Sequence, residues 1–153
     1  MYDSSKPYIS DILDLIKTTW ETTHVSVNED GSVREKPSYG LQYRRYPHTD
    51  GIGTKGVYHW QQRTFREAVN DAIAANFNNC LVARATVYEV MPTISLPEDD
   101  HDAVIEITEH LVRECRLRDV AIPGGETEIL NTLEGLNITL AVRGCVANRS
   151  SNR

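Results

Sequence analysis

The segment from Thr49 to Lys55 carries the strongest chemical signal in the sequence, Thr-Asp-Gly-Ile-Gly-Thr-Lys. Two glycines in so short a segment let the backbone approach a ligand closely, and their N–H groups can converge on phosphate oxygens. Thr54 adds a hydroxyl and Lys55 a point charge for the same phosphates, while Asp50 can reach a magnesium ion bound to them. The order G-x-x-x-x-G-K-[ST] of a Walker loop is absent, and taken alone the segment is explained equally well as a tight turn after a strand.

A second, weaker signal is Gly124-Gly125-Glu126-Thr127, which follows a short apolar run. The glycine pair again permits close approach of the backbone, and it would direct Glu126 and Thr127 at whatever is bound there. A hairpin turn is the better explanation of these four residues when they are considered by themselves.

The third signal is Val69-Asn70-Asp71, which falls within an expected amphipathic helix. Adjacent residues lie about 100° apart around a helix, so Asn70 and Asp71 can both border one side of a cleft. An exposed polar pair on such a helix is the usual explanation, and alone this signal is weak.

The histidines indicate no metal site. His101 and His110 share an expected helix, but no H-E-x-x-H pattern is present. His24 and His59 have no recognisable partner in the sequence. His48 is adjacent to the glycine segment, where we expect it to cap or pack rather than to act in catalysis.

Composition and charge limit the class of protein. The 153 residues fit one domain, and the net charge of −6 argues against a non-specific nucleic-acid binder, which usually presents a basic face. No apolar run approaches the roughly 20 residues needed to cross a membrane, and residues 1–6 do not resemble a secretory signal. Three cysteines without C-x-x-C spacing are typical of reduced thiols, so we expect a cytoplasmic protein.

Hydrophobic periodicity predicts helices and strands in alternation. Expected helices carry apolar residues from Ile9 to Trp20, cover 63–77 up to a stop at Asn78-Asn79, and run from an acidic first turn at 98–100 to Cys115. Expected strands cover 39–46, ending at Pro47, then 80–91, before a loop between Pro92 and Pro97, and 137–142 at the end. This pattern favours an α/β or α+β domain with helices packed on a sheet, and it leaves the strand order open.

Together and in this order, the three signals resemble the N-terminal half of aminoimidazole ribonucleotide synthetase, also called phosphoribosylformylglycinamidine cyclo-ligase. The family reads T-D-G-V-G-T-K, V-N-D and G-G-E-T-A-E at comparable spacing. The resemblance divides the chain into an N-terminal helix and connector (1–38), an ATP-binding synthetase-like domain (39–147) and a polar tail (148–153). It implies an α/β (α+β) fold whose sheet is packed by helices and pairs with that of a second subunit in a homodimer.

The resemblance also implies a reaction, in which ATP activates the amide oxygen of formylglycinamidine ribonucleotide, a nitrogen closes the imidazole ring, and ADP and phosphate leave. The cofactors would be ATP and Mg²⁺. Carried over residue by residue, the implied catalytic residues are Asp50 and Lys55. The implied metal ligands are Asp50, Asp71 and Glu126. The implied nucleotide-binding residues are Gly51, Gly53, Thr54, Lys55, Asn70, Gly124, Gly125 and Thr127.

The chain also departs from the family. Family enzymes are much longer, with a second domain that helps to build the substrate cleft, and their aspartate two turns before V-N-D is replaced here within Gln62-Arg63-Thr64. The leading interpretation is a cytoplasmic homodimer that acts on a small phosphorylated substrate, with a separate C-terminal-domain partner and without nucleic-acid or membrane partners. One alternative is a non-catalytic homologue that keeps the fold for dimerisation or assembly. Another is a different ATP-dependent member of the superfamily.

Overall fold

The structure is a computed structural model that describes residues 7–36 and 43–147. The first part of the expected strand at 39–46 and the expected polar tail at 148–153 therefore lie outside the described residues. The elements in chain order are α1 (Pro7–Ile16), a 3₁₀ turn (Lys17–Thr19), β1 (Val25–Val27), β2 (Val33–Glu35), β3 (Tyr43–Gly51), α2 (Lys55–Gln62), α3 (Phe65–Val82), β4 (Thr86–Leu96), α4 (His101–Leu117), β5 (Glu126–Ile129) and β6 (Asn137–Ala147).

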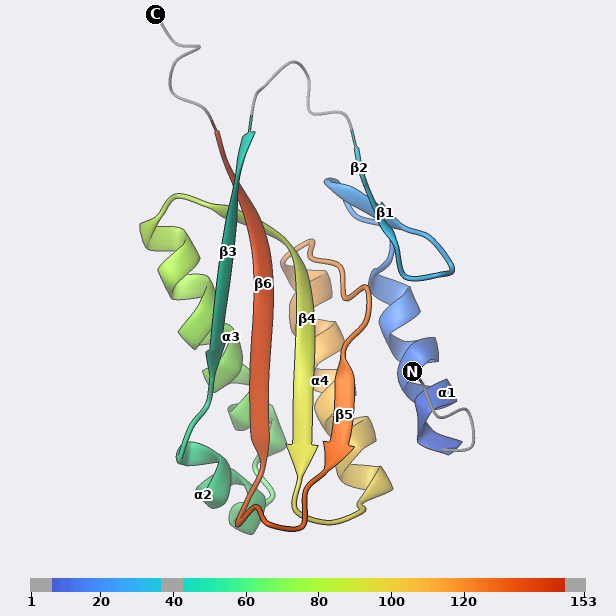
Figure 1. The fold of residues 1–153 in the computed structure, drawn as a ribbon, viewed down its shortest axis with the longest axis vertical. Coiled ribbons are helices and arrows are strands. Elements are labelled where there is room, and N and C mark those ends of the chain that lie inside the picture. The colour runs from blue at the N-terminus through green and yellow to red at the C-terminus, as the bar shows by residue number, and fades with distance from the viewer. Residues whose placement is uncertain (1–6, 37–42, 148–153) are drawn as a thin grey trace, which may run out of the picture.

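A four-stranded sheet in the order β3-β6-β4-β5 forms the centre of the molecule. β6 is antiparallel to both β3 and β4, and β4 is parallel to β5. Helices α3 and α4 cover one face of this sheet, and α1 packs against α4 (Figure 1). Within residues 7–36 and 43–147, no helix lies on the opposite face. The helix-covered sheet confirms the predicted α/β (α+β) fold class.

The alternation predicted for the closing strand is confirmed. Ile138, Leu140 and Val142 of β6 are buried against the helices, whereas Ala141 and Arg143 are exposed on the helix-free face. The predicted apolar side of α4 is also confirmed, since Val104, Ile107, Leu111, Val112 and Cys115 are all buried.

The strand expected at 39–46 was predicted to end at Pro47, and this is wrong, because β3 continues through the proline to Gly51. β3 is an edge strand that pairs with β6, from Tyr43 opposite Ala147 to Gly51 opposite Thr139. Proline lacks a backbone N–H, and an edge strand can place that missing donor on its unpaired side. Thr49, Asp50 and Gly51 are consequently strand residues rather than loop residues.

The predicted helix stop at Asn78-Asn79 is also wrong. Asn79 bonds its side-chain amide to the carbonyl of Ala75 at 2.8 Å, which keeps it within the helix, and the buried Cys80 extends the apolar stripe. Arg84, with φ of 57°, follows the helix end, and the strand predicted at 80–91 is shifted to Thr86–Leu96. Pro92 lies within β4, just before its pairing with β5 begins at Thr93, so the loop expected between Pro92 and Pro97 is not present.

The N-terminal helix is shorter than expected but packs on the same core as the sheet. α1 ends at Ile16, and Trp20 lies beyond the 3₁₀ turn, where its indole N–H donates to the carbonyl of Ile122 at 2.8 Å. Tyr8 and Ile16 belong to the main buried cluster. The β1–β2 hairpin contributes Val25 to a smaller cluster. The division of the chain at residue 39 remains a prediction.

Candidate functional site

The segment from Thr49 to Lys55 forms a strand, a turn and the start of a helix. Ile52 is buried after the strand and donates its N–H to the carbonyl of Ile138 at 3.1 Å. Gly53 has φ of 61°, a left-handed conformation that favours glycine. Lys55 then opens α2, a helix absent from the sequence prediction, so the segment presents backbone N–H groups and a lysine at the carboxyl end of β3.

Asp50 is held where β3 meets α3. Its carboxylate accepts the N–H of Gly51 at 2.8 Å, and its carbonyl accepts the amide of Asn76 at 3.2 Å. Asn76 is fully buried and also bonds the Nδ1 atom of His48 at 3.0 Å. Sequence reasoning missed Asn76, whose signal was a single amide in the apolar stripe of a helix. The expectation that His48 caps or packs rather than acts in catalysis remains a prediction.

A network of side chains joins α2 to the second sequence motif. The Nε2 atom of His59 lies 2.7 Å from Asp71 Oδ2, and its Nδ1 atom lies 2.7 Å from the hydroxyl of Thr64. The ammonium of Lys55 lies 3.9 Å from Asp71 Oδ1. The expectation that His59 has no partner is therefore wrong. The pairing arises because the turn between α2 and α3 folds residues twelve positions apart onto each other.

An arginine closes the turn between α2 and α3. Arg63 has φ of 57°, lies over the rings of Trp60 and Phe65, and donates to Asp100 Oδ2 at 2.7 Å. Asp100 also caps α4 by accepting the N–H of Ala103 at 3.1 Å. Burial acts to raise the pKa of Asp100, but the bonds from Arg63 and Ala103 outweigh it and hold the pKa below its usual value. Arg63 thus lies within Gln62-Arg63-Thr64, where the family has an aspartate, and its ion pair with Asp100 connects the end of α2 to the start of α4.

Replacing Asp100 by asparagine is expected to lower the stability near neutral pH by about 1 kcal/mol, because asparagine can cap the helix but cannot form the ion pair. The depressed pKa stabilises the folded protein above the ordinary carboxyl value of 3.8, and this contribution is lost as the pH falls through the folded value. Urea unfolding of wild type and Asp100→Asn from pH 7 to pH 3 should show the two converging in acid. A difference independent of pH would contradict this assignment.

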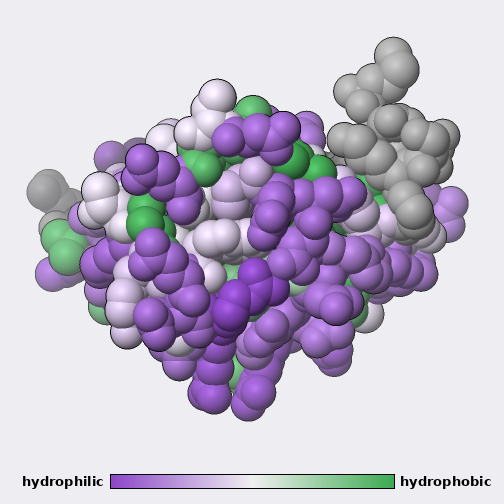
Figure 2. Space-filling model, turned by 90° about the horizontal axis from the view of Figure 1, so that it is seen from below, coloured by the Kyte–Doolittle hydropathy of each residue, from purple (hydrophilic) through white to green (hydrophobic). Residues whose placement is uncertain are grey.

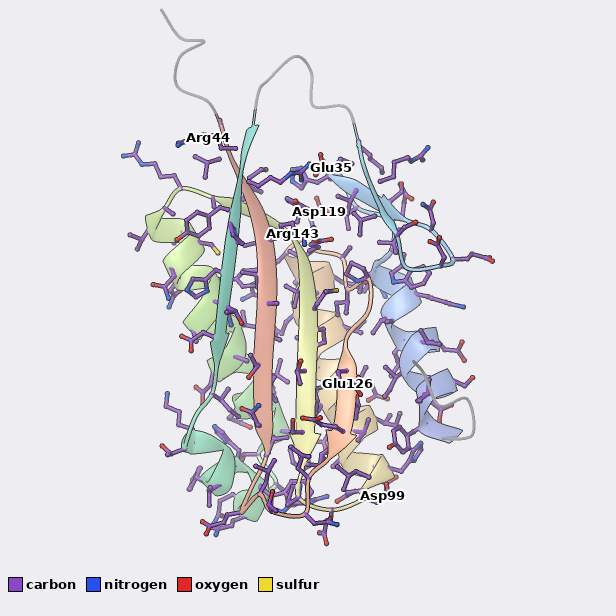
Figure 3. All side chains as sticks on the ribbon, in the orientation of Figure 1. Glu35, Arg44, Asp99, Asp119, Glu126 and Arg143 are labelled. Atoms are coloured by element: carbon purple, nitrogen blue, oxygen red, sulfur yellow. The ribbon has the colours of Figure 1, made fainter. Side chains whose placement is uncertain are left out.

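The third motif lies at the other edge of the sheet. Across the strands, Gly51 is opposite Thr139, Thr139 is opposite Thr93, and Thr93 is opposite Glu126. Three strand spacings separate Gly51 from Glu126, about 14 Å in all. Glu126 extends from β5, far from β3 (Figure 3). Its neighbour Gly125 lies against Pro92, where an added Cβ would come within 2.5 Å of the Pro92 carbonyl oxygen.

The predicted site residues therefore fall into groups. The residues that lie together are Asp50, Gly51, Gly53, Thr54, Lys55 and Asp71. Asn70 instead lines a separate hollow between α3, the start of β4 and the residues that follow α4, together with Phe77 and Arg118. A third group, formed by Gly124, Gly125, Glu126 and Thr127, precedes and begins β5. Seen from the end where α2 lies, the surface is mainly hydrophilic (Figure 2).

The three carboxylates implied as magnesium ligands do not converge. Asp71 is engaged by His59, Asp50 bonds its own backbone neighbour, and Glu126 lies across the sheet. Among residues 7–36 and 43–147, no group of three or more His, Cys, Asp or Glu side chains is placed to hold a metal ion. The side chains present therefore do not fit a magnesium site built by this chain alone.

A second polar cluster lies at the opposite end of the sheet. Arg45 pairs with Glu35 and donates to the hydroxyl of Tyr88 at 2.9 Å, and Arg143 pairs with the buried Glu89 at 3.0 Å. Burial raises the pKa of Glu89. A small cavity of about 120 Å³ adjoins this cluster and is lined by His24, Val25, Glu35, Lys36, Arg45, Tyr88 and Cys145. Glu35 and Arg143 are both near this end (Figure 3).

Comparison with curated proteins connects this geometry to a known family. No protein-family model matches the chain. Over 140 residues it is 26% identical to phosphoribosylformylglycinamidine cyclo-ligase of Saccharolobus solfataricus, a similarity that covers 91% of this chain and 42% of that protein. The predicted resemblance to the cyclo-ligase family is confirmed.

Solved structures confirm the fold. The hydrogenase maturation protein HypE, solved in complex with ATP, matches with a TM-score of 0.61 at 15% identity, over 93% of this chain and 41% of that chain. Thiamine-monophosphate kinase from Stenotrophomonas maltophilia matches with a TM-score of 0.52 at 18% identity, over 94% of this chain and 43% of that chain. The chain spans less than half the length of these relatives. In the part of the chain that the structure describes, none of the helices has the length and apolar character needed to cross a bilayer.

Proposed function

We propose that this chain binds ATP at the carboxyl end of β3 and is the nucleotide-handling part of a cyclo-ligase-type enzyme. The single observation that carries the proposal is the approach of Lys55, at the start of α2, to Asp71 on α3. Two of the three sequence motifs thereby meet at one place. The similarity to a cyclo-ligase and the fold shared with an ATP complex of HypE support the same ligand.

The residues at this place suit the binding of phosphates. The N-terminal end of α2 carries a partial positive charge, which favours a bound phosphate. The side chain of Lys55 is 68% exposed, so its ammonium can reach a bound phosphate. Phosphoryl transfer depends mainly on positioning and charge neutralisation, and these groups can supply both. The resemblance also implies a magnesium ion, for which the described carboxylates of this chain form no common site.

The finer proposal is ATP-dependent closure of formylglycinamidine ribonucleotide to aminoimidazole ribonucleotide. In this proposal, Lys55 neutralises charge on the transferred phosphoryl group. Asp50 fixes the carboxyl end of β3 through its hydrogen bond with the N–H of Gly51. The proposal includes a C-terminal-domain partner that completes the substrate cleft, as the resemblance implies. HypE has been solved in a complex with HypF, so a protein of this fold does assemble with another chain.

We also propose that the chain pairs with a second copy through the helix-free face of its sheet. Met91 is 45% exposed there, beside Ala141 in the neighbouring strand. Light scattering should give the mass of a dimer, and a monomer at all concentrations would contradict this pairing.

We also propose that the protein is cytoplasmic, because its cysteines are free thiols, of which Cys80 and Cys115 are buried. Burial raises the pKa of Cys115 to about 12, which makes that thiol unreactive.

The alternative function is a non-catalytic homologue that keeps the fold as an assembly module. Two observations favour it: Arg63 stands in the stretch where the family has an aspartate, and Glu126 lies far from Lys55. Equilibrium dialysis with radiolabelled ATP separates the two functions. The proposal predicts saturable binding of one ATP per chain in the micromolar-to-millimolar range. Absence of saturable binding would leave only the assembly module.

A further inference from the structure

Asp71 is committed to partners within the chain. Its Oδ2 atom lies 2.7 Å from His59 Nε2, and its Oδ1 atom lies 3.9 Å from the ammonium of Lys55. An ionised carboxylate can only accept hydrogen bonds, so Nε2 of His59 must carry the proton in this pair. Oδ2 of Asp71 thus accepts a hydrogen bond, and Oδ1 lies near a positive charge, which disfavours a second cation at the same carboxylate.

His59 is itself fixed on its other side. Its Nδ1 atom lies 2.7 Å from the hydroxyl of Thr64, and Thr64 donates its backbone N–H to the carbonyl of His59 at 3.0 Å. The side chain of His59 is only 8% exposed. A metal ion at Oδ2 of Asp71 would compete with the His59 N–H, which is costly to leave without a partner, and a metal ion at Oδ1 would lie beside the positive charge of Lys55.

Asp50 and Glu126 cannot share one ion, so the three implied ligands cannot meet around a single metal ion. Ligands of a magnesium ion lie about 2.1 Å from it, so two ligand oxygens are at most about 4.2 Å apart. Glu126 is on β5, about 14 Å across the sheet from the end of β3. Pairing in the sheet also places Asp50 on the same face as Leu140, towards the helices, and Glu126 on the face of Thr139.

We propose that Asp71 positions Lys55 and His59 for an anionic ligand and does not ligate a metal ion, so that this site takes the phosphates of a nucleotide without a divalent ion bound to the protein. The inference rests on the proposed function for its ligand. It departs from the magnesium site that the resemblance implies. Lys55, the most exposed member of the network, contacts the phosphates, and Asp71 is a positioning residue.

Manganese is the probe for a metal site in the full-length chain, because free Mn²⁺ gives an electron paramagnetic resonance signal that binding broadens. Wild type without nucleotide should leave the signal of free Mn²⁺ unchanged up to millimolar concentration, as should Asp71→Asn. A matched control is Asp102→Asn, since the Asp102 side chain is fully exposed on α4. Saturable Mn²⁺ binding that Asp71→Asn abolishes and Asp102→Asn keeps would overturn the inference.

Calorimetric titration with ATP supplies the second measurement on the wild type. The ATP affinity in excess EDTA should stay within about threefold of the affinity in excess Mg²⁺, a difference below 1 kcal/mol. A loss of more than about tenfold in EDTA would overturn the inference and leave the proposed ATP binding intact. Absence of ATP binding under both conditions would overturn the proposed function, and the inference with it.

Discussion

Replacing Gly56 by alanine is expected to destabilise the fold by about 3 kcal/mol or more, through overpacking and a lost backbone hydrogen bond. Gly56 lies in α2 directly against the backbone of Leu136, and an added Cβ would overlap the Leu136 carbonyl. The N–H of Leu136 also donates to the carbonyl of Gly56 at 3.1 Å. The obstacle is backbone rather than a flexible side chain, so the helix or the segment before β6 has to move.

Thermal unfolding followed by circular dichroism measures this effect, and a fall in Tm of about 10 °C is expected for a chain of this size. Gly124→Ala is the matched control, because an added Cβ there meets nothing within 4 Å. Its Tm should stay within about 2 °C of the wild type. Equal behaviour of the two variants would show that α2 does not pack on Leu136 as described.

Replacing Lys55 by methionine is expected to weaken ATP binding about tenfold to a hundredfold, the effect of losing one charge-assisted hydrogen bond to phosphate. Methionine keeps most of the aliphatic length and removes the ammonium. The fold should be unaffected, since the Lys55 side chain is 68% exposed and its pair with Asp71 is long.

Calorimetric titration of ATP into wild type and Lys55→Met measures this loss, and Lys17→Met is the control. Lys17 lies in the 3₁₀ turn after α1, where its ammonium is over the ring of Trp20. Helices α1 and α2 lie on opposite sides of the molecule (Figure 1). The Lys17→Met variant should bind ATP with the affinity of the wild type. Equal losses in both lysine variants would indicate a general effect of charge rather than a contact with the ligand.

The parts of the fold that the sequence predicts are those with an unambiguous local pattern. Ile138, Leu140 and Val142 alternate with less apolar residues, which is the period of a half-buried strand. The acidic residues before α4 predicted its start, and Asp100 does cap that helix. In both cases neighbouring residues contain the whole signal.

The elements that sequence reasoning missed depend on distant parts of the chain. Pro47 is acceptable in β3 only because β3 is at the edge of the sheet, and strand order cannot be read from the sequence. α2 has glycine at its second position and a short sequence, and it is stabilised by its contact with Leu136. Its helical character therefore comes from packing rather than from local propensity.

The candidate site shows the same division. The glycine segment from Thr49 to Lys55 was identified from its residues, because glycines and a lysine in close succession have a local chemical meaning. The pair between His59 and Asp71 was not, since it exists only when α2 and α3 fold back at Arg63. The distance of Glu126 from Lys55 could not be predicted from the sequence either, because it depends on β6 and β4, which lie between β3 and β5 in the sheet.

The position of bound ATP is measured residue by residue when ¹⁵N-labelled protein is titrated with ATP. If ATP binds at the carboxyl end of β3, the largest amide shifts fall at Gly51 to Gly56 and at Asp71, where α2 begins and α3 passes it. Shifts confined to the cavity lined by His24, Lys36 and Cys145 at the opposite end, with the glycine segment unchanged, would contradict it.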